Sequence, residues 1–309
     1  MIKYFYRNLQ SPKVTELDKS KRGVWIHSEN PSQREIDTLT SKFKLEIGHI
    51  EDALDEDEMP RLEREGKQSY IFVRYPFQTS DGDMDTAPLL VVIDDDNVLT
   101  VSQRPLKSVE RFTRGKDAVV TTQRTKLLLL ILADISQAYD NSIRITSRKI
   151  KQIRTRLRNQ KLTNQDLIDF VILEDELNEF LASLLPNNAT LRRLLAGRHI
   201  SLFEADQDIV EDLLLINDQS IEAIRANLRS IDNIRNAHTA ISSNNLNKTI
   251  TFLTLATIMV ALPNVFFGMY GMNVSLPFQQ AHWVFIALIG INLTLISIIM
   301  GFAKKKNLI

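Results

Sequence analysis

The feature that most constrains this chain is a long stretch near its C-terminal end that carries no charged side chain. Between Thr249 and Ala303 there is no Asp, Glu, Lys or Arg. An α-helix needs about 20 apolar residues to cross the hydrocarbon core of a bilayer, so this stretch has room for two spans, which we place at 249–269 and 282–302. The alternative, a helical hairpin buried in a soluble core, needs a large domain around it. We therefore predict two transmembrane helices joined by a short loop at 270–281.

Basic residues flank both predicted spans on the same side. Lys304, Lys305 and Lys306 follow the second span, and Lys248 precedes the first, after three arginines within 225–235. Because Lys and Arg accumulate on the cytoplasmic side of a membrane, we expect both termini in the cytoplasm, with a basic tail at 303–309 and the loop outside. The N-terminal residues lack the apolar segment of a cleaved signal peptide. The sequence thus predicts a multi-pass protein of the cytoplasmic (inner) membrane.

The charge balance and the absence of cysteine narrow the function classes. The chain has 38 basic and 38 acidic residues, so no overall positive field indicates nucleic acid as a partner. Without cysteine there is no thiol catalysis and no thiolate metal site, which leaves oxygen atoms as the expected metal ligands. No phosphate loop or nucleophile motif is present. We expect neither enzyme activity nor an organic cofactor. The histidines form no cluster in the sequence, being His27, His49, His199, His238 and His282.

Upstream of the first span, the sequence predicts an unusually long helix. No glycine occurs between Arg198 and Phe267. A helix from about residue 206 through the first span would be about 95 Å long at 1.5 Å per residue. No small domain encloses such a rod, so we interpret 204–248 as the stalk of a homo-oligomer. Apolar residues recur along it at a spacing close to that of a coiled-coil seam, at Ile221, Ile224, Leu228, Ile231, Ile234 and Ile241.

The segment before the stalk, 121–203, contains two amphipathic helical patterns. The first, 124–158, is rich in Lys and Arg from residue 144 onward, whereas the second, 163–185, is acidic. The second begins with Thr163 and Asp166 at the spacing of a capping box. A basic helix beside an acidic one predicts a hairpin with compensating charges. A nucleic-acid or lipid role for the basic part is the less favoured alternative.

The first 120 residues are of a different kind. Runs of β-branched and aromatic residues, such as GVWIH, SYIFVRYPF, APLLVVID and NVLTVSQ, are bounded by turn residues and predict strands. DDDN at 94–97 predicts a hairpin turn between the last two, and 31–44 and 105–114 are expected to be helical. The predicted fold class is an α+β membrane protein with an N-terminal α/β cytoplasmic domain (1–120), a long stalk helix and two C-terminal transmembrane helices.

One face of the first predicted span carries small and polar residues. Small and polar residues are also favoured where two helices pack in a membrane, which is the alternative interpretation. A stripe with two asparagines favours a water-filled cavity. We predict that the first span (249–269) lines a pore and that the more uniformly apolar second span faces lipid. The stripe residues follow one another at spacings of three or four: Asn247, Thr251, Thr254, Thr257, Ala261, Asn264 and Gly268.

The loop between the spans begins with Tyr270, Gly271, Met272 and Asn273. A Gly-Met-Asn tripeptide between two C-terminal spans, with a lysine-rich tail, resembles the signature of the CorA family of divalent-cation channels. NKTITFLT (247–254) resembles the inner-pore segment of that family, and IEDALDEDEMPRLE resembles its acidic, proline-containing cytoplasmic segment. The resemblance covers the architecture of almost the whole chain.

The resemblance implies a homopentamer that conducts Mg²⁺, with Co²⁺ and Ni²⁺ as further candidate ions. Residues 270–273 would form the selectivity filter, where amide and carbonyl oxygens hold a hydrated ion without stripping its waters. The implied partners are further copies of the chain, the lipid bilayer and divalent cations, without nucleic acid. The pore-lining set, which combines the stripe with the resemblance, is Asn247, Ile250, Leu253, Thr254, Thr257, Ala261, Asn264 and Gly268.

The resemblance also implies regulation by cytoplasmic Mg²⁺. It places Glu51 and Asp52 of one subunit beside Asp212 on the stalk of its neighbour, where a bound cation would hold the closed state together. Two alternatives remain open: a zinc transporter of the same superfamily, and a poorly conducting membrane-anchored cation sensor. A mere anchor has no need of the polar stripe on the first span.

The sequence departs from the family pattern at three places. The outer loop VSLPFQQAHW has no acid, which weakens the expectation that it concentrates cations. Ala261 stands where a methionine constriction is common, so Ile250 and Leu253 become the expected hydrophobic gate. Pro263 lies one place later than expected, which leaves the register of the helix kink open.

Overall fold

The computed structural model describes residues 1–114, 119–159, 162–197, 200–278 and 281–305. The contacts within the chain divide it into two units, Met1–Asn233 and Ile234–Ile309. Helix α6 (Glu204–Tyr270) contributes to both. The N-terminal unit therefore contains the sheet and the hairpin, and the C-terminal unit contains the predicted spans.

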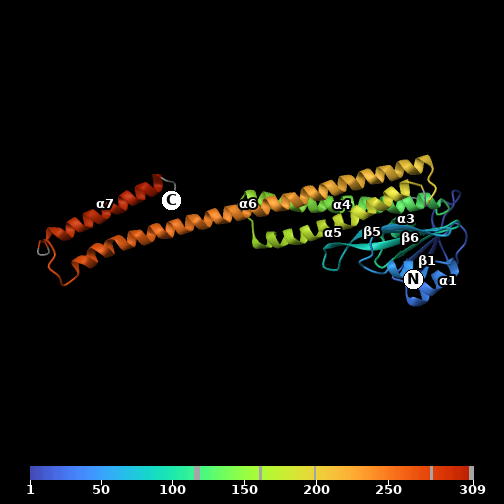
Figure 1. Cartoon of the computed structure of the whole chain (residues 1–309), viewed down its shortest axis with the longest axis horizontal. Coiled ribbons are helices and arrows are strands. Elements are labelled where there is room, and N and C mark those ends of the chain that lie inside the picture. Colours follow the sequence, from blue (N-terminus) through green and yellow to red (C-terminus); the bar gives the residue numbers. More distant parts are fainter. Residues whose placement is uncertain (115–118, 160–161, 198–199, 279–280, 306–309) are drawn as a thin grey trace. The chain divides into compact units, whose positions relative to one another are not determined.

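Within its described residues, the first unit is built on a seven-stranded sheet (Figure 1). The strand order is β2-β1-β3-β7-β6-β5-β4, and β3 and β7 are the parallel pair among otherwise antiparallel neighbours. The predicted turn at 94–97 is confirmed, because the Asp94 N–H donates to the Asn97 carbonyl (3.2 Å) between β6 and β7. The strands are β1 (Ile2–Tyr6), β2 (Thr15–Leu17), β3 (Trp25–Glu29), β4 (Arg61–Glu65), β5 (Gln68–Gln78), β6 (Met84–Ile93) and β7 (Val98–Ser102).

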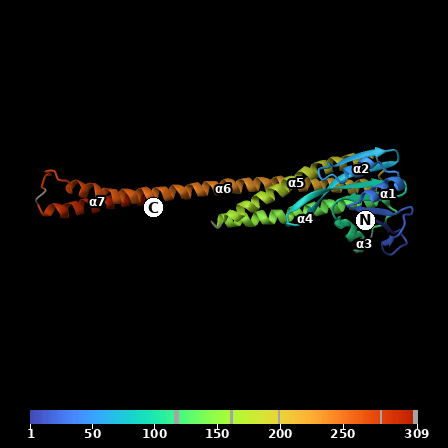
Figure 2. The same ribbon diagram turned by 90° about the horizontal axis from the view of Figure 1, so that it is seen from below.

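Helices cover both faces of this sheet. On one face, α1 (Gln33–Phe43) and α2 (Ile47–Asp52) enclose an apolar core with the strands. On the other face lie α4 (Arg124–Arg158) and α5 (Asn164–Leu195), with α3 (Lys107–Arg114) beside α4 (Figure 2). Because both faces are covered, β5 and β6 are buried along most of their length. Their nearly continuous apolar sequence follows from this position.

The helical hairpin begins as predicted. Helix α4 has the predicted bounds, and the capping box at the start of α5 is confirmed. The Thr163 N–H donates to Asp166 Oδ2 (2.8 Å), and the Asp166 N–H donates to Thr163 Oγ1 (3.3 Å). Two of the four free N–H groups at a helix start thereby gain partners.

The predicted end of the second hairpin helix, at residue 185, is wrong. Proline lacks an N–H and usually ends a helix, but α5 continues through Pro186 to Leu195. Side chains on both sides of the proline bond to the sheet: Ser183 Oγ donates to Thr86 Oγ1 (2.9 Å), and Asn187 bonds to both backbone groups of Arg74. These contacts hold the helix in place where its own ladder is interrupted.

The long helix predicted from about 206 to 269 is confirmed as α6. In the first unit α6 packs against the hairpin, where Asn227 Nδ2 donates to Ser147 Oγ (2.7 Å) and Ile221, Ile224 and Ile231 are buried. Residues 239–250, by contrast, are exposed on every side. A helix gains most of its stability from packing, so this exposed stretch is available to contact other chains.

The second unit contains the two predicted spans. Its second helix, α7 (Trp283–Lys305), follows the loop after α6. Both α6 and α7 contain a segment long and apolar enough to cross a membrane. The predicted basic tail begins inside α7, and its residues 306–309 lie outside the described residues.

One buried histidine in β3 makes the fold sensitive to acid. His27 is 3% exposed; its Nδ1 lies 2.9 Å from Thr100 Oγ1, and its Nε2 has no partner among the described residues. Burial, with the positive charges of Lys3 and the N-terminal amine, lowers the pKa of His27 from 6.5 to about 4. Between these two pH values the unfolded chain takes up a proton that the folded chain does not, so acid favours unfolding.

We therefore predict that lowering the pH from 7 to 4.5 destabilises the wild-type protein more than the His27→Gln variant, by about 2 to 3 kcal/mol. Trp25 reports the transition, since its Nε1 donates to Thr100 Oγ1 beside His27 (3.0 Å). Trp25 fluorescence during thermal unfolding, in a Trp283→Phe background, is the measurement. Parallel pH profiles for the two proteins would show that His27 does not cause the effect.

Candidate functional site

In the second unit, α7 packs along one side of α6. The ring centroids of Phe267 and Phe285 lie 6.2 Å apart, and Val284, Leu288 and Asn292 of α7 are buried. At 100° per residue, the partly covered positions of α6 share one arc of the helix. These positions are Thr251, Leu255, Ala256, Met259, Leu262, Pro263, Phe266 and Tyr270.

The predicted pore-lining residues occupy the opposite side of α6. At 100° per residue, their mean direction lies about 170° from the centre of the covered arc. Polar side chains on this face are costly against lipid, so the face requires water or another helix. Thr251, which belongs to the sequence stripe, instead lies at the margin covered by α7. All eight positions of the pore-lining set are exposed: Asn247, Ile250, Leu253, Thr254, Thr257, Ala261, Asn264 and Gly268.

The threonines on this face present acceptor oxygens. Thr254 Oγ1 donates to the Ile250 carbonyl (2.8 Å), and Thr257 Oγ1 donates to the Leu253 carbonyl (2.9 Å). Because each hydroxyl proton is used within the helix, the lone pairs of the oxygen remain free. The water molecules around a dication point their hydrogens outward. This face therefore offers hydrogen-bond acceptors to a hydrated cation.

The loop that starts at Tyr270 is shaped by a close backbone approach. The Gly271 N–H donates to the Phe267 carbonyl (2.9 Å), and a Cβ at Gly271 would lie 3.2 Å from that same oxygen. A side chain at this position would therefore force the turn to shift. Tyr270 Oη donates to the Pro277 carbonyl (3.4 Å), which braces the loop across its base. The loop thus leaves Met272 and Asn273 exposed.

An aromatic contact at the end of this loop was not predicted from the sequence. Phe278 adopts a left-handed backbone conformation (φ 65°), and its ring lies 5.7 Å from that of Trp283. The conformation costs a non-glycine residue energy, and the ring contact compensates part of it. No turn signal in PFQQ predicts this arrangement.

The three predicted regulatory acids do not meet within one chain. Glu51 and Asp52 end α2, whereas Asp212 is exposed on α6. Asp52 Oδ2 accepts a hydrogen bond from the Arg61 guanidinium (2.6 Å), a partner that the sequence analysis did not anticipate. Among the described residues, no three acids or histidines are arranged to hold a metal ion. A site made from these three acids therefore requires a second copy of the chain.

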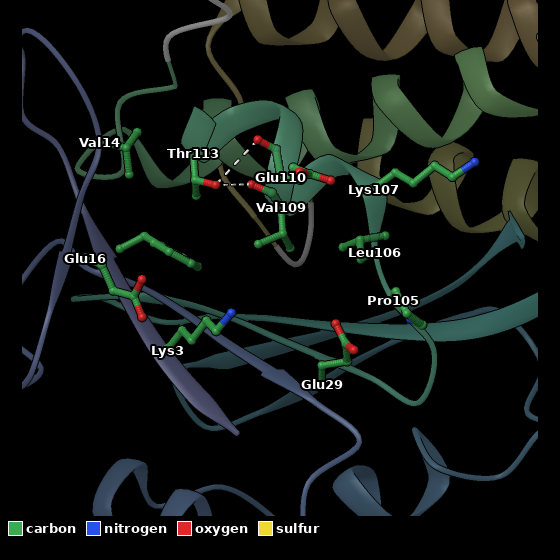
Figure 3. A pocket seen from close by; sticks show the side chains of 11 residues that line it. Lys3, Val14, Glu16, Glu29, Pro105, Leu106, Lys107, Val109, Glu110 and Thr113 are labelled. Carbon is green, nitrogen blue, oxygen red and sulfur yellow. Dashed lines mark hydrogen bonds between the residues drawn. The ribbon is translucent and has the colours of Figure 1, made fainter. Parts of the chain in front are cut away.

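A separate hollow of about 430 Å³ lies between β1, β2 and α3 (Figure 3). Its lining carries charges of both signs, Lys3 and Lys107 with Glu16, Glu29 and Glu110. The Thr113 hydroxyl is turned to the helix, where it donates to the Val109 carbonyl (2.6 Å). None of the sequence-predicted site residues lines this hollow.

Comparison with known proteins identifies the family of this chain. The model of the family described as "CorA-like Mg²⁺ transporter protein" matches residues 20–305. The chain belongs to this family. CorA-family proteins are ion transporters rather than enzymes, so the two apolar helices of the second unit are membrane spans.

Individual relatives agree with this assignment. The "Cobalt/magnesium transport protein CorA" of Methanocaldococcus jannaschii is 23% identical over 297 residues, which cover 91% of each chain. The complete structure of the CorA magnesium transporter from that organism superposes with a TM-score of 0.85 at 20% identity, covering 100% of this chain and 99% of the other. At that identity the superposition shows a common fold.

A further solved structure shares the fold of the cytoplasmic part. The cytoplasmic domain of ZntB from Vibrio parahaemolyticus has a TM-score of 0.62 at 10% identity, covering 78% of this chain and 98% of that domain. At that identity the likeness shows a common fold alone.

Proposed function

We propose that this chain forms a homopentameric channel that conducts Mg²⁺ inward across the cytoplasmic membrane, with Co²⁺ and Ni²⁺ as further permeant ions. The observation that carries the proposal is the exposed polar face of α6, which lies opposite the side covered by α7. In a ring of subunits, such faces can meet around a common water-filled axis. The stretch 239–250, exposed on every side, supplies contact surface between neighbouring stalks.

The orientation follows from the basic flanks. Lys248 before the first span and Lys304 and Lys305 after the second favour a cytoplasmic position for both ends of the membrane region. The loop with Gly271, Met272 and Asn273 then faces the outside and forms the first constriction that an entering ion meets.

Asn273 is the proposed filter residue. Its amide oxygen is neutral, so it can accept hydrogen bonds from the waters of Mg²⁺ without binding the ion too tightly to release it. The Gly271 N–H closes the turn on the Phe267 carbonyl, and Tyr270 braces the turn through Pro277.

Asn273→Ala should abolish Mg²⁺ uptake, because it removes the amide that holds the hydrated ion. The measurement is Mg²⁺ flux into liposomes that contain the purified protein, with size-exclusion chromatography to verify assembly. Asn236→Ala, an exposed asparagine of α6 outside the membrane span, is the control and should transport normally. Undiminished uptake by a correctly assembled Asn273→Ala variant would refute the filter.

Ile250 and Leu253 are the proposed gate. Both are apolar and exposed on the pore-lining face, at 51% and 58%. A ring of such side chains closes a narrow pore by excluding water, without a covering segment.

Leu253→Ser should therefore raise basal Mg²⁺ leak severalfold, because a hydroxyl keeps the constriction wet. Phe252→Ser is the matched control: it makes the same polar change one residue away, about 100° around the helix. Leak is measured in the same liposomes at high internal Mg²⁺. Equal leak in the two variants would place the gate elsewhere, with Asn247 as the next candidate.

Cytoplasmic Mg²⁺ is the proposed regulator of this channel. Glu51 and Asp52 of one subunit and Asp212 of its neighbour would share a Mg²⁺ ion in the closed state. Carboxylates brought together repel one another unless a cation lies between them. Mg²⁺ closes the pore to the extent that it binds the closed assembly more tightly than the open one.

One alternative is the zinc transporter of the same superfamily, which the resemblance to the CorA family leaves open. The poorly conducting sensor is the other. Flux of Mg²⁺, Co²⁺ and Zn²⁺ through the same preparation separates them: a zinc transporter passes Zn²⁺ preferentially, and a sensor passes little of any.

A further inference from the structure

The acidic segment around Asp52 contains its own counter-ion, Arg61. The guanidinium of Arg61 donates to Asp52 Oδ2 (2.6 Å) and also contacts the carboxylates of Glu58 and Glu63. Its other side is occupied as well, because the guanidinium carbon lies 3.9 Å from the centroid of the Phe72 ring. One cation therefore holds three carboxylates and is itself held against the sheet.

The backbone that carries these acids is held by hydrogen bonds from the sheet. Arg74 on β5, whose side chain is 9% exposed, donates to the carbonyls of Glu56 (2.6 Å) and Glu58 (3.1 Å). Arg104 pairs with the Glu56 carboxylate (2.8 Å). The acidic segment is therefore an ordered element between α2 and β4, and Arg61 is aimed into it.

A guanidinium and a dication can both neutralise clustered carboxylates, but they bind them with different geometry. Arg61 presents a planar fork that spreads its carboxylates around it. Mg²⁺ instead binds through one or two carboxylates and retains waters. While Arg61 holds Asp52, that carboxylate is not free to bind Mg²⁺.

We propose that Arg61 competes with Mg²⁺ for Asp52 and thereby sets the Mg²⁺ concentration at which the channel closes. The inference rests on the regulatory site proposed above. The exchange is possible because the groups are accessible: the side chains of Arg61 and Asp52 are 26% and 43% exposed. Mg²⁺ binding at Asp52 releases Arg61. Breaking the Arg61–Asp52 contact costs free energy, and this cost weakens the binding of Mg²⁺.

The test is Mg²⁺-dependent thermal stabilisation of the full chain in lipid nanodiscs. In Arg61→Gln the competitor is gone, so the Mg²⁺ concentration for half-maximal stabilisation should fall about two- to fivefold, the effect of one partly exposed ion pair. Without Mg²⁺ the same variant should melt earlier than wild type, since Asp52, Glu58 and Glu63 then repel one another. Sufficient Mg²⁺ should remove that difference.

Arg104→Gln is the matched control. It removes an arginine that pairs with Glu56 of the same acidic segment but makes no contact with Asp52. Its half-maximal Mg²⁺ concentration should equal that of wild type. Arg61→Lys, which keeps the charge but loses the fork, should fall between wild type and Arg61→Gln, and it replaces that variant if Arg61→Gln does not fold.

The double variant Asp52→Asn/Asp212→Asn separates this inference from the site on which it rests. If it weakens Mg²⁺ stabilisation while Arg61→Gln leaves the half-maximal concentration unchanged, the regulatory site stands and the competition is refuted. If neither changes the Mg²⁺ response, both are refuted. Channel activity is assessed separately by the Asn273→Ala flux experiment. Added to Arg61→Gln, Asp52→Asn should cancel the gain in Mg²⁺ affinity.

Discussion

The membrane helices are governed by the cost of polar groups in hydrocarbon. A bilayer core offers no water to backbone N–H and carbonyl groups, so the uncharged stretch must form helices that satisfy those groups internally. The same cost applies to the side chains of Thr254, Thr257 and Asn264, which α7 does not cover. A single copy of the chain thus has an α6 face that belongs in neither lipid nor a finished core. In the proposed assembly these faces would meet around water, and that arrangement would provide the pathway for ions.

In the cytoplasmic unit, arginine side chains fix the position of the acidic segment between α2 and β4. Arg61 and Arg74 hold the acidic segment on β5, one through carboxylates and the other through carbonyls. From β5, bonds continue to α5, since Asn187 binds the backbone of Arg74. Helix α5 in turn contacts α6, where Asn188 Nδ2 donates to Asp218 (2.7 Å). A change at the acidic segment is therefore connected by direct contacts to the helix that continues into the membrane.

How much of this was predictable from the sequence depended on the kind of signal. Helix α4 and the length of α6 were predicted because their periodicity is long and uninterrupted. The end of α5 was not, because tertiary bonds from Ser183 and Asn187 outweigh the local effect of Pro186. Strands β2 (TEL) and β4 (RLERE) and helix α2 were missed because they are short and polar and exist through their neighbours.

The candidate site shows the same division. The stripe on α6 could be assigned to one face from spacing alone, since helix geometry fixes it. The position of Thr251 at the edge of the side covered by α7 could not be predicted from spacing, because it depends on where α7 packs. Likewise Asp52 was selected by resemblance, whereas its contact with Arg61 depends on the turn between α2 and β4. A sequence specifies which residues share an element more directly than which elements meet.

The central claim, that the α6 face opposite α7 lines the ion path, is tested most directly by thiol accessibility, since the chain has no native cysteine. Thr257→Cys lies on that face, and Met259→Cys, two residues away, lies on the side covered by α7. A small cationic methanethiosulfonate reagent is added during Mg²⁺ flux into liposomes. The account predicts that it blocks flux through Thr257→Cys and leaves Met259→Cys unaffected. Block of Met259→Cys alone would contradict it.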